Sequence, residues 1–445
     1  MHILSYRGLP DDETGRVKVA GGNVSVSASL FRLVQSSGAN WFNWVGNDLR
    51  VTAADGRSRI LDSFSPETIE RHYRCSNGLF WPLLHLYPEF VQYDQNDLDA
   101  YWSIQNAAAK TVIANCGGQP VNVHDYQLFG VPALLKEAGV RSTFFLHLPF
   151  PKEVADQYVW ALQYAVSGML GAEVIGLHIP SYRRNLLAFV RKHLANEFKV
   201  KGNSIIRLDD GTVTRVVVSP IGTNKQLWSA MADNEVQLPP DLSGKKLFML
   251  IGRSDPAKGI PNCIRAWGMF QQHYPAAAAD SVLLVISSPS REQVDCFKTE
   301  RLIIERSAEL VRDFVPGSLV FRNVGLPAHE LASYYRQASV LLACSKHDRE
   351  GWGLTAPEFA ACQDARRGAV IGMSKGVGAY SVFGDFVTEL DPENPLQMAA
   401  RFADLRNSIG SQTSIYRMGQ MQARIPTMDG WWKDMQLTSP RASAA

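Results

Sequence analysis

Short apolar segments alternate with amphipathic segments along this chain, and this alternation constrains its fold more than any other feature. Such apolar runs are typical of buried parallel strands, and the amphipathic segments are typical of the helices that cover them. In the first half we expect strands at Gln119–Val123, Ser142–Leu148, Glu173–Leu177 and Thr214–Ser219, and helices at Leu128–Ala138 and Pro180–Leu194. In the second half we expect strands at Lys246–Ile251, Ser281–Ile286, Ser318–Phe321, Val340–Ala343 and Ala369–Gly372, and helices at Pro261–Tyr274, Ala328–Ala338 and Ala356–Cys362. The pattern predicts an α/β protein.

A chain of 445 residues is too long for one ordinary core, and the two halves of the pattern predict two doubly wound, Rossmann-like domains. We expect the junction between Ile221 and Lys245, in a polar, proline-bearing and weakly periodic stretch. The expected domains are 1–222 and 223–410. The remainder, 411–445, is expected to be a helical segment that packs back on the N-terminal domain and ends in a frayed tail. Because open parallel sheets bind ligands beyond the carboxyl ends of their strands, we expect a ligand cleft at the domain junction.

Composition excludes several classes of partner. The 45 basic and 43 acidic residues leave a net charge of +2, so no overall field favours nucleic acid or an anionic membrane. The six cysteines contain no CxxC pair, which argues against zinc and fits a reducing compartment. The chain start lacks the pattern of a signal peptide, and no apolar run approaches the roughly 20 residues of a membrane helix. We expect a cytoplasmic enzyme without metal or cofactor.

Two glutamates, eight positions apart, flank a glycine-bearing loop that leads into an apolar helix, in the run Glu350-Gly-Trp-Gly-Leu-Thr-Ala-Pro-Glu358. The free N–H groups of a helix start attract phosphate, and carboxylates beside them accept hydrogen bonds from sugar hydroxyls. This spacing resembles the two-glutamate signature of retaining nucleotide-sugar glycosyltransferases. A capped helix with two solvated acids is the alternative interpretation.

Two cations follow another predicted strand. Arg253 and Lys258 lie five positions apart in a loop that begins just after Ile251. At the carboxyl end of a strand, such a pair can neutralise a departing diphosphate. A surface ion-pair loop is the alternative. The separate Asp97-Leu98-Asp99 resembles a metal-binding DxD motif, but acids at the start of a helix are equally expected because they favour its dipole.

Polar residues also end two strands of the first half. His124 and Asp125 follow one predicted strand, and His147 ends the next. We interpret Asp125 and His147 as functional because both fall where the cleft is expected, whereas His124 fits a hydrogen-bonded core residue. Trp44 and Trp81 lie beside glycine or proline, as indoles that line sugar sites often do.

Taken in order, these motifs are similar to those of the trehalose-6-phosphate synthase family of retaining GT-B glycosyltransferases. The resemblance spans roughly Ile3 to Ala379. Its residues are Ser5-Tyr6-Arg7, Gly21-Gly22, Trp41-Phe-Asn-Trp44, Ser76-Asn77 with Trp81-Pro82, His124-Asp125-Tyr126-Gln127-Leu128, Phe144 to Pro151, Gly176-Leu-His, Ser219-Pro-Ile-Gly222, Arg253 with Lys258-Gly259, Ser290-Arg291 and Glu350 to Glu358.

The resemblance implies an acceptor-binding N-terminal domain and a nucleotide-sugar-binding C-terminal domain. It assigns catalysis to Asp125, His147, Arg253, Lys258 and Glu350. It assigns donor binding to Gly22, His147, Arg253, Lys258, Glu350, Gly351, Trp352, Gly353, Leu354 and Glu358, the last of these at the ribose. It assigns acceptor binding to Arg7, Trp44, His72, Tyr73, Trp81, Asp125 and Arg291, with Arg7, Trp81 and Arg291 at the acceptor phosphate.

This chain differs from the family's usual sequence at two places, the run from Glu350 to Glu358 and the position near His72. The family usually has Asp-Gly-Met-Asn-Leu-Val-Ala-Lys-Glu where this chain has Glu350 to Glu358, so Trp352 and Gly353 stand for Met and Asn. We expect an altered donor pocket and weak use of UDP-glucose. The family's phosphate-binding tyrosine falls near His72, with Tyr73 adjacent.

The implied reaction moves a hexosyl group from a nucleoside diphosphate sugar to a sugar phosphate such as glucose 6-phosphate. Retention without a carboxylate nucleophile beside the diphosphate loop favours front-face displacement, in which the departing phosphate oxygen takes the acceptor proton. Relatives that couple pseudosugars to aminocyclitol phosphates or glycosylate glycerol phosphate remain alternatives. So do a non-catalytic ligand sensor, which would be expected to lose the cations, and an epimerase or hydrolase, which would need neither Arg7 nor Arg291. Homo-oligomerisation stays open.

Overall fold

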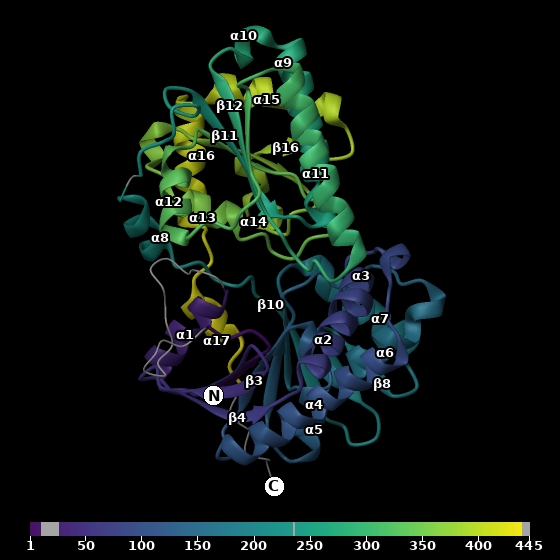
Figure 1. Cartoon of the computed structure of the whole chain (residues 1–445). Helices are drawn as coiled ribbons and strands as arrows, with labels where there is room; N and C mark the ends of the chain where they lie inside the picture. Colours follow the sequence, from purple (N-terminus) through teal and green to yellow (C-terminus); the bar gives the residue numbers. More distant parts are fainter. Residues whose placement is uncertain (10–25, 235, 438–445) are drawn as a thin grey trace. The chain divides into compact units, whose positions relative to one another are not determined.

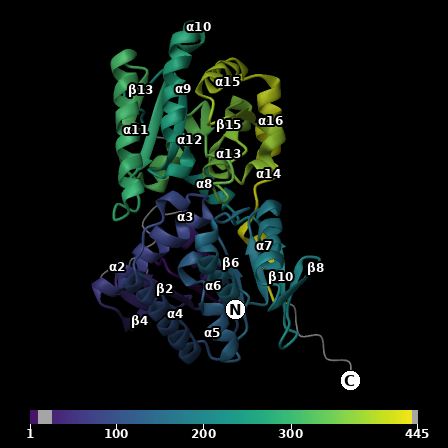
Figure 2. The same cartoon turned by 90° about the vertical axis from the view of Figure 1, so that its right-hand side faces the viewer.

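The computed structural model describes residues 1–9, 26–234 and 236–437, which form two compact units (Figures 1 and 2). Among these residues, the first unit comprises 1–9, 26–222 and 428–437, and the second comprises 223–234 and 236–427. The chain therefore leaves the first unit after Gly222 and returns to it at Met428. The expected helical segment 411–445 is divided, because 411–427 groups with the second unit.

The first unit is built on a ten-stranded sheet in the order β4-β3-β2-β1-β5-β6-β7-β10-β9-β8. Its strands are β1 (His2–Ser5), β2 (Trp41–Val45), β3 (Asp48–Thr52), β4 (Ser58–Ser63), β5 (Val121–His124), β6 (Ser142–Phe145), β7 (Val174–Leu177), β8 (Phe198–Lys201), β9 (Ser204–Arg207) and β10 (Val213–Val218). The run from β2 to β10 is parallel, and the two strand pairs at each end of the sheet are antiparallel. Ser5 pairs with His124, and His124 with Phe145, so the carboxyl ends of β1, β5 and β6 meet at one edge.

Helices cover this sheet. They are α1 (Val26–Ser37), α2 (Pro66–Cys75), α3 (Trp81–Leu84), α4 (Gln95–Asn115), α5 (Val131–Glu137), α6 (Val159–Met169), α7 (Pro180–His193) and the returning α17 (Met428–Asp434). α4 packs against α2 and α5, and α5 against α6, whereas α1 and α17 lie beyond the other side of the strands (Figure 1). Asp94 and Asp97 form a capping box at the start of α4, and Asp97 also accepts a hydrogen bond of 2.7 Å from Arg74. Asp97, the first acid of the DxD-like sequence, thus takes part in capping a helix, as expected if its role is structural and not metal binding.

The second unit is built on a six-stranded parallel sheet in the order β13-β12-β11-β14-β15-β16. Its strands are β11 (Lys246–Arg253), β12 (Ser281–Ser288), β13 (Leu319–Arg322), β14 (Val340–Ala343), β15 (Val370–Ser374) and β16 (Thr388–Leu390). This is the Rossmann order, in which the order of the strands across the sheet reverses between β11 and β14. The loops after β11 and β14 therefore leave the sheet side by side.

Two helical layers enclose the second sheet. The helices are α8 (Lys225–Ala232), α9 (Ile260–His273), α10 (Pro275–Ala278), α11 (Asp295–Phe314), α12 (Ala328–Gln337), α13 (Thr355–Cys362), α14 (Tyr380–Phe383), α15 (Pro395–Ser408) and α16 (Gln412–Ala423). α9 packs against α11 and α15 over a core that includes Trp267 and Phe402. α13 packs against α8, α12 and α16. α16 thus belongs to the second unit, whereas sequence patterning had placed it on the N-terminal domain, because patterning does not reveal which sheet a helix covers.

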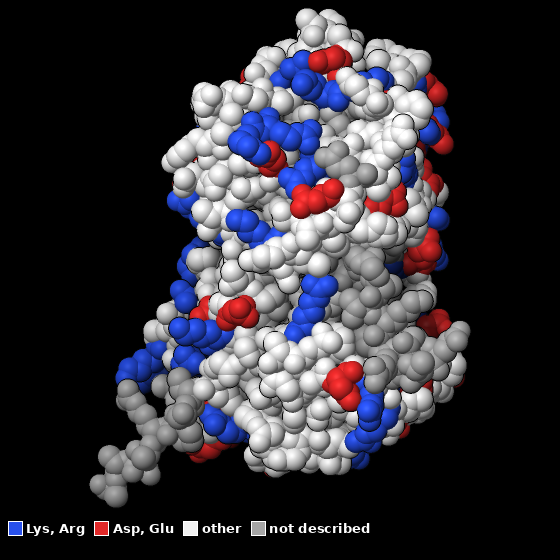
Figure 3. Space-filling model, turned by 90° about the vertical axis from the view of Figure 1, so that its left-hand side faces the viewer, with Lys and Arg blue, Asp and Glu red and all other residues white. Residues whose placement is uncertain are grey.

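The two parallel-sheet units confirm the predicted α/β class, and every expected strand and helix overlaps an observed one. β2, β3 and β4, which extend one edge of the first sheet, were not expected. Figure 3 shows Lys and Arg interspersed with Asp and Glu on one face, in keeping with the small net charge. Within the described ranges, no helix combines the length and hydropathy that crossing a membrane requires.

Candidate active site

The carboxyl edge of the first sheet brings together Asp125 and His147, which sequence patterning selected, and Arg7, which the family resemblance assigned. Arg7 follows β1, Asp125 follows β5 and His147 follows β6. Asp125 has a φ of 73°, which is rare for a residue with a side chain, and its carboxylate accepts a hydrogen bond of 3.1 Å from the backbone N–H of His147. The backbone N–H of Asp125 in turn donates to Phe145 at 2.9 Å. The unusual backbone conformation is thus held by both neighbouring strands, as is common at functional sites.

Burial and charge act in opposite directions on these groups. Burial raises the pKa of Asp125, while His147 and Arg7 lower it. Burial likewise lowers the pKa of His147, and the Asp125 carboxylate raises it. His147 is therefore a neutral imidazole at pH 7, suited to exchanging hydrogen bonds with sugar hydroxyls.

A row of histidines extends from His147 into the unit. His124 Nδ1 and His147 Nε2 are 2.9 Å apart, so one ring donates to the other. The ring of His178 lies 5.8 Å from that of His147, and its Nδ1 accepts from the backbone N–H of Ile221. Sequence reasoning treated His124 as a core residue and did not select His178. The available signals for His178 were its place in the quoted motif Gly176-Leu-His and its position just after β7, the next strand in the sheet.

Aromatic rings line the same edge beside Arg7. The ring of Tyr6 lies 5.5 Å from that of Trp44 and 4.5 Å from that of His72. Tyr6 and Tyr73 are half-buried, whereas Trp44 is almost fully buried. Tyr6 was quoted within a motif but not assigned a role, and it stands between two residues that were.

His72 does not occupy the position that an acceptor ligand needs. It has no exposed surface, stacks on Tyr101 at 5.2 Å, and its Nε2 bonds the backbone oxygen of Gln127 at 3.1 Å. Burial lowers its pKa to about 4, so the ring is neutral at pH 7 and carries no charge for a phosphate. The structure thus places His72 under Tyr6 as a packing residue, and Tyr6 and Tyr73 are the hydroxyls near this position.

Trp81 is also buried. Its ring has no exposed surface and stacks on His85 with ring centres 4.0 Å apart. It begins α3 directly after the π-helix Ser76–Phe80, a form that often marks functional sites. Gly78 is required within this turn, because a Cβ there would lie 2.1 Å from the carbonyl oxygen of Gln92. The ring of Trp81 was expected at the acceptor phosphate, and its burial gives it no open face.

In the second unit, the loop after β11 is organised by a buried carboxylate. Asp255 accepts a hydrogen bond of 3.1 Å from the backbone N–H of Ala257 and forms ion pairs with Arg253 at 3.7 Å and Arg291 at 3.4 Å. The Arg253 side chain is 44% exposed, whereas that of Arg291 is 3% exposed and lies over the ring of Phe297. Arg253 can therefore reach a ligand. Arg291, expected at the acceptor phosphate, is instead buried against Asp255, which sequence reasoning did not select.

The loops after β11 and β14 meet through side chains. Lys258 Nζ contacts Glu350 Oε1, and Ser345 Oγ donates to Glu350 Oε2. The backbone also joins the loops, because Lys346 N–H donates to the carbonyl of Ala257 at 2.8 Å. Lys258 and Glu350 are 92 positions apart, and only the strand order brings them together.

The backbone between Glu350 and α13 is packed tightly against a glycine-bearing loop after β15. Gly353 has a φ of 77°, and Ala379 N–H donates to the carbonyl of Trp352 at 2.8 Å. A Cβ at Gly378 would lie 2.0 Å from the carbonyl oxygen of Gly351. Trp352 itself is 3% exposed and contacts Phe383, so its indole fills the core of the unit. We expected this ring to reshape the donor pocket. A large apolar ring is more stable buried than exposed, and the indole of Trp352 is buried in the unit, so this expectation no longer has support.

Glu358 lies in the first turn of α13, with Leu354 at the N-cap. Burial raises its pKa to about 8, and Lys258 opposes this shift. Its carboxylate makes no hydrogen bond to the residues that the structure describes. An acceptor group without a partner beside a helix start and a cation is a ready site for ligand hydroxyls.

Two points complete the set of residues. Gly22, expected at the donor diphosphate, lies outside the described residues. Within residues 1–9, 26–234 and 236–437, no group of three or more His, Cys, Asp or Glu side chains is arranged to hold a metal ion.

Comparison with known proteins agrees with this arrangement. A solved UDP-forming α,α-trehalose-phosphate synthase from Burkholderia xenovorans, in complex with glucose 6-phosphate, superposes with a TM-score of 0.83 at 22% identity, over 97% of this chain and 98% of the other. The fold is therefore that of the GT-B glycosyltransferases. The profile described as glycosyltransferase family 20 matches residues 17–433. The chain belongs to glycosyltransferase family 20, as its motifs predicted.

Curated relatives support the same family. The UDP-forming α,α-trehalose-phosphate synthase of Schizosaccharomyces pombe is 25% identical over 413 residues, which cover 86% of this chain and 78% of the relative. The 56 kDa subunit of the UDP-forming synthase of Saccharomyces cerevisiae is 27% identical over 401 residues, which cover 83% and 79%. The chain is a glycosyltransferase.

Proposed function

We propose that this chain transfers a glucosyl group, with retention of anomeric configuration, from UDP-glucose to glucose 6-phosphate and so forms trehalose 6-phosphate. The relatives above are described as UDP-forming trehalose-phosphate synthases, and one solved relative holds glucose 6-phosphate. The single observation in this chain that carries the proposal is the meeting of Lys258, Glu350 and Glu358 where the strand order of the second sheet reverses.

The donor would be held by the second unit. Arg253 and Lys258 supply positive charge for the diphosphate, and the N-terminus of α13 supplies backbone N–H groups. Glu358 accepts hydrogen bonds from the ribose hydroxyls. Because Lys258 is paired with Glu350 in the structure, a bound diphosphate would share this cation with the carboxylate.

The acceptor would be held by residues of the first unit. Arg7 is exposed and supplies positive charge for the acceptor phosphate. Trp44 and Tyr6 offer an aromatic wall, and Asp125 and His147 hold the sugar hydroxyls. The predicted front-face displacement needs no carboxylate nucleophile, since the departing phosphate oxygen takes the acceptor proton. The side chains then act by positioning the substrates and by stabilising charge. The predicted cleft stays a prediction.

A coupled assay with UDP-glucose and glucose 6-phosphate tests this function. We expect UDP release that requires glucose 6-phosphate, and an α,α-linked disaccharide phosphate whose anomeric protons are read by NMR. UDP release at the same rate without an acceptor would contradict transfer. No release with any nucleotide sugar would instead favour the ligand-sensing alternative.

The burial of His72 favours a second candidate function. The family's tyrosine contacts the acceptor phosphate, but its place near His72 holds a neutral, buried ring, and the nearby hydroxyls are those of Tyr6 and Tyr73, so the phosphate ligands here differ from the family's. A different phosphorylated acceptor, such as an aminocyclitol phosphate or glycerol phosphate, then remains a candidate. The same assay with a panel of acceptors and donors decides between them by comparing kcat/KM.

A cytoplasmic location is proposed from the thiols. All six cysteines are free, and five of them are buried. Free thiols are typical of reducing compartments.

A further inference from the structure

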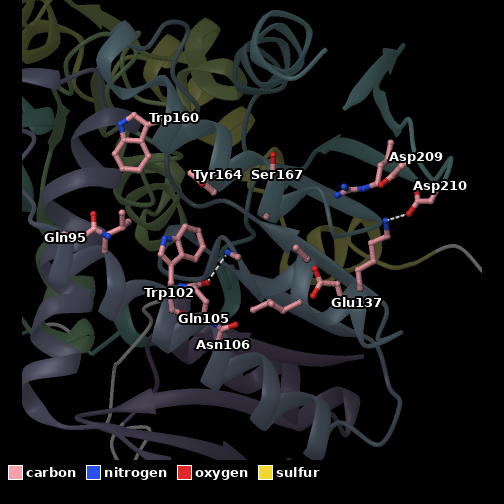
Figure 4. A pocket seen from close by; sticks show the side chains of 17 residues that line it. Gln95, Trp102, Gln105, Asn106, Glu137, Trp160, Tyr164, Ser167, Asp209 and Asp210 are labelled. Atoms are coloured by element: carbon pink, nitrogen blue, oxygen red, sulfur yellow. Dashed lines mark hydrogen bonds and ion pairs between the residues drawn. The ribbon is translucent and has the colours of Figure 1, made fainter. Parts of the chain in front are cut away.

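A cavity of about 990 Å³ lies on the first unit, outside the residues assigned to the transfer reaction. Residues of α4, α5 and α6 line it, together with the turn between β9 and β10 (Figure 4). It shares no residue with the donor, acceptor or catalytic sets. It is therefore a separate concave surface, at the upper end of the roughly 300–1,000 Å³ typical of ligand pockets.

Aromatic side chains gather at one end of this cavity (Figure 4). The ring of Tyr164 lies 6.0 Å from that of Trp102 and 6.3 Å from that of Trp160. Tyr164 is 62% exposed, and both tryptophans are half-buried. The face of an aromatic ring is electronegative and attracts the weakly positive C–H groups of a sugar ring. Three rings from α4 and α6 can contact more than one sugar.

Groups that suit hydroxyls surround these rings. In the described part of the chain, the indole N–H groups of Trp102 and Trp160 and the hydroxyl of Tyr164 make no hydrogen bond. Gln95 and Asn106 donate through their amide nitrogens to Asp99 at 2.8 Å and to the carbonyl of Trp102 at 3.0 Å. Their amide oxygens remain as acceptors. Donors and acceptors next to aromatic faces match the chemistry of a polyol.

The charges at the other end of the cavity exclude an anion. Lys136 and Arg207 are outnumbered by Glu137, Asp209 and Asp210, and Lys136 is already paired with Asp210 at 2.5 Å. Figure 4 shows these carboxylates at the end away from the tryptophans. A sugar phosphate or nucleotide would be repelled here. The ligand that fits is hydroxyl-rich and uncharged.

We propose that this cavity is a second binding site, which takes a neutral saccharide of two or more sugar rings. The site holds either a free disaccharide or a stretch of a longer glycan, since both present the same stacked rings and hydroxyls. It is independent of the transfer site and of the donor and acceptor proposed above.

Saturation-transfer NMR and calorimetry on the full chain test this site with trehalose, maltoheptaose and glucose 6-phosphate as probes. We expect binding of maltoheptaose, or of both neutral probes, that Tyr164→Ala weakens. Glucose 6-phosphate, which the proposed function places at the acceptor site, should bind the wild type and Tyr164→Ala equally. Binding of maltoheptaose alone assigns a longer glycan, whereas equal binding of trehalose assigns a free disaccharide. Tyr164→Ala and Trp160→Ala should each weaken binding by about tenfold or more, because each removes a stacking face.

Tyr416→Ala is the matched control, because Tyr416 lies on α16 of the second unit and is also 62% exposed. It should leave binding unchanged, and Tyr164→Ala should keep the wild-type melting temperature and turnover. The proposal is overturned if neither neutral probe binds, or if Tyr164→Ala binds as tightly as the wild type. A dimer that Tyr164→Ala converts to a monomer in sedimentation would overturn it as well, by assigning this face to a second copy of the chain.

Discussion

At the scale of single residues, Glu358 combines a functional position with a stability cost that depends on pH. Burial raises the pKa of this carboxyl from its usual 4.5 to about 8. Between these values the unfolded chain has released the proton and the folded chain keeps it, so the free energy of unfolding falls as the pH rises. With the pKa at about 8 even beside Lys258, the acid is protonated at pH 7 until a ligand favours its ionised form.

We expect Glu358→Gln to flatten this dependence. Urea unfolding at pH 5 and pH 8 should show the wild type losing roughly 3–4 kcal/mol more than the variant, since one pKa unit corresponds to about 1.4 kcal/mol and most of the shift lies between these pH values. Glu393→Gln, at an exposed acid of the same unit, is the control and should behave as the wild type. Parallel pH profiles for wild type and Glu358→Gln would contradict the raised pKa.

Of the two cations assigned to the diphosphate, Arg253 is the more exposed, at 44% against 20% for Lys258. Its side chain forms an ion pair of 3.7 Å with Asp255, which also pairs with Arg291. We expect Arg253→Ala to lower kcat by about 10²–10³, as the loss of one transition-state donor does, with an unchanged melting temperature. Arg401→Ala, at another exposed arginine, should keep full turnover. Near-normal turnover of Arg253→Ala would remove Arg253 from the diphosphate site.

At the scale of elements, the loop between β14 and α13 depends on its glycines. Asn tolerates a positive φ better than most residues, but a Cβ at Gly353 would lie 2.6 Å from Cγ1 of Val377. We expect Gly353→Asn, which restores the family's residue, to destabilise the protein by about 1–3 kcal/mol. Val377→Ala should recover part of this loss, and thermal unfolding of the four variants of this cycle measures the coupling.

The same cycle tests donor choice. If Asn at this position supplies a hydrogen bond to the donor, the double variant Gly353→Asn with Val377→Ala should raise kcat/KM for UDP-glucose above that of Val377→Ala alone. Trp352 is kept in these variants, because its buried indole would leave a packing defect if it were replaced by Met. Additive unfolding energies for the two substitutions would contradict the predicted clash.

At the scale of the whole molecule, the returning helix α17 completes the first unit. Trp431 is 1% exposed and contacts His124 at 5.6 Å and Phe145 at 5.2 Å, beneath the edge that carries Asp125. We expect Trp431→Ala to cost about 3–5 kcal/mol in the free energy of unfolding, because it leaves a cavity. Trp432→Ala, at the half-buried neighbour, should cost much less, and equal losses would contradict a specific role for Trp431.

The sequence alone determined the repeating pattern and the local chemistry of this protein. β14 begins and ends where its apolar run does, and the ends of α7 and α12 agree with the expected ends to within one residue, because strand and helix propensity depend on near neighbours. The order of the motifs also identified the family. Asp125, His147, Arg253 and Lys258 were selectable because each lies at or just after the carboxyl end of a recognisable strand.

Tertiary structure decided what those residues contact. The pairing of Lys258 with Glu350 spans 92 positions, and α17 returns to the first sheet after the whole second unit, so neither follows from local pattern. Trp352, Trp81 and His72 match the motif positions yet are buried, because motif spacing specifies backbone position and not the direction of a side chain. Burial is a property of the packed core, since it depends on every neighbour at once. For the same reason only the folded structure could reveal that the carboxyl of Glu358 holds its proton at neutral pH.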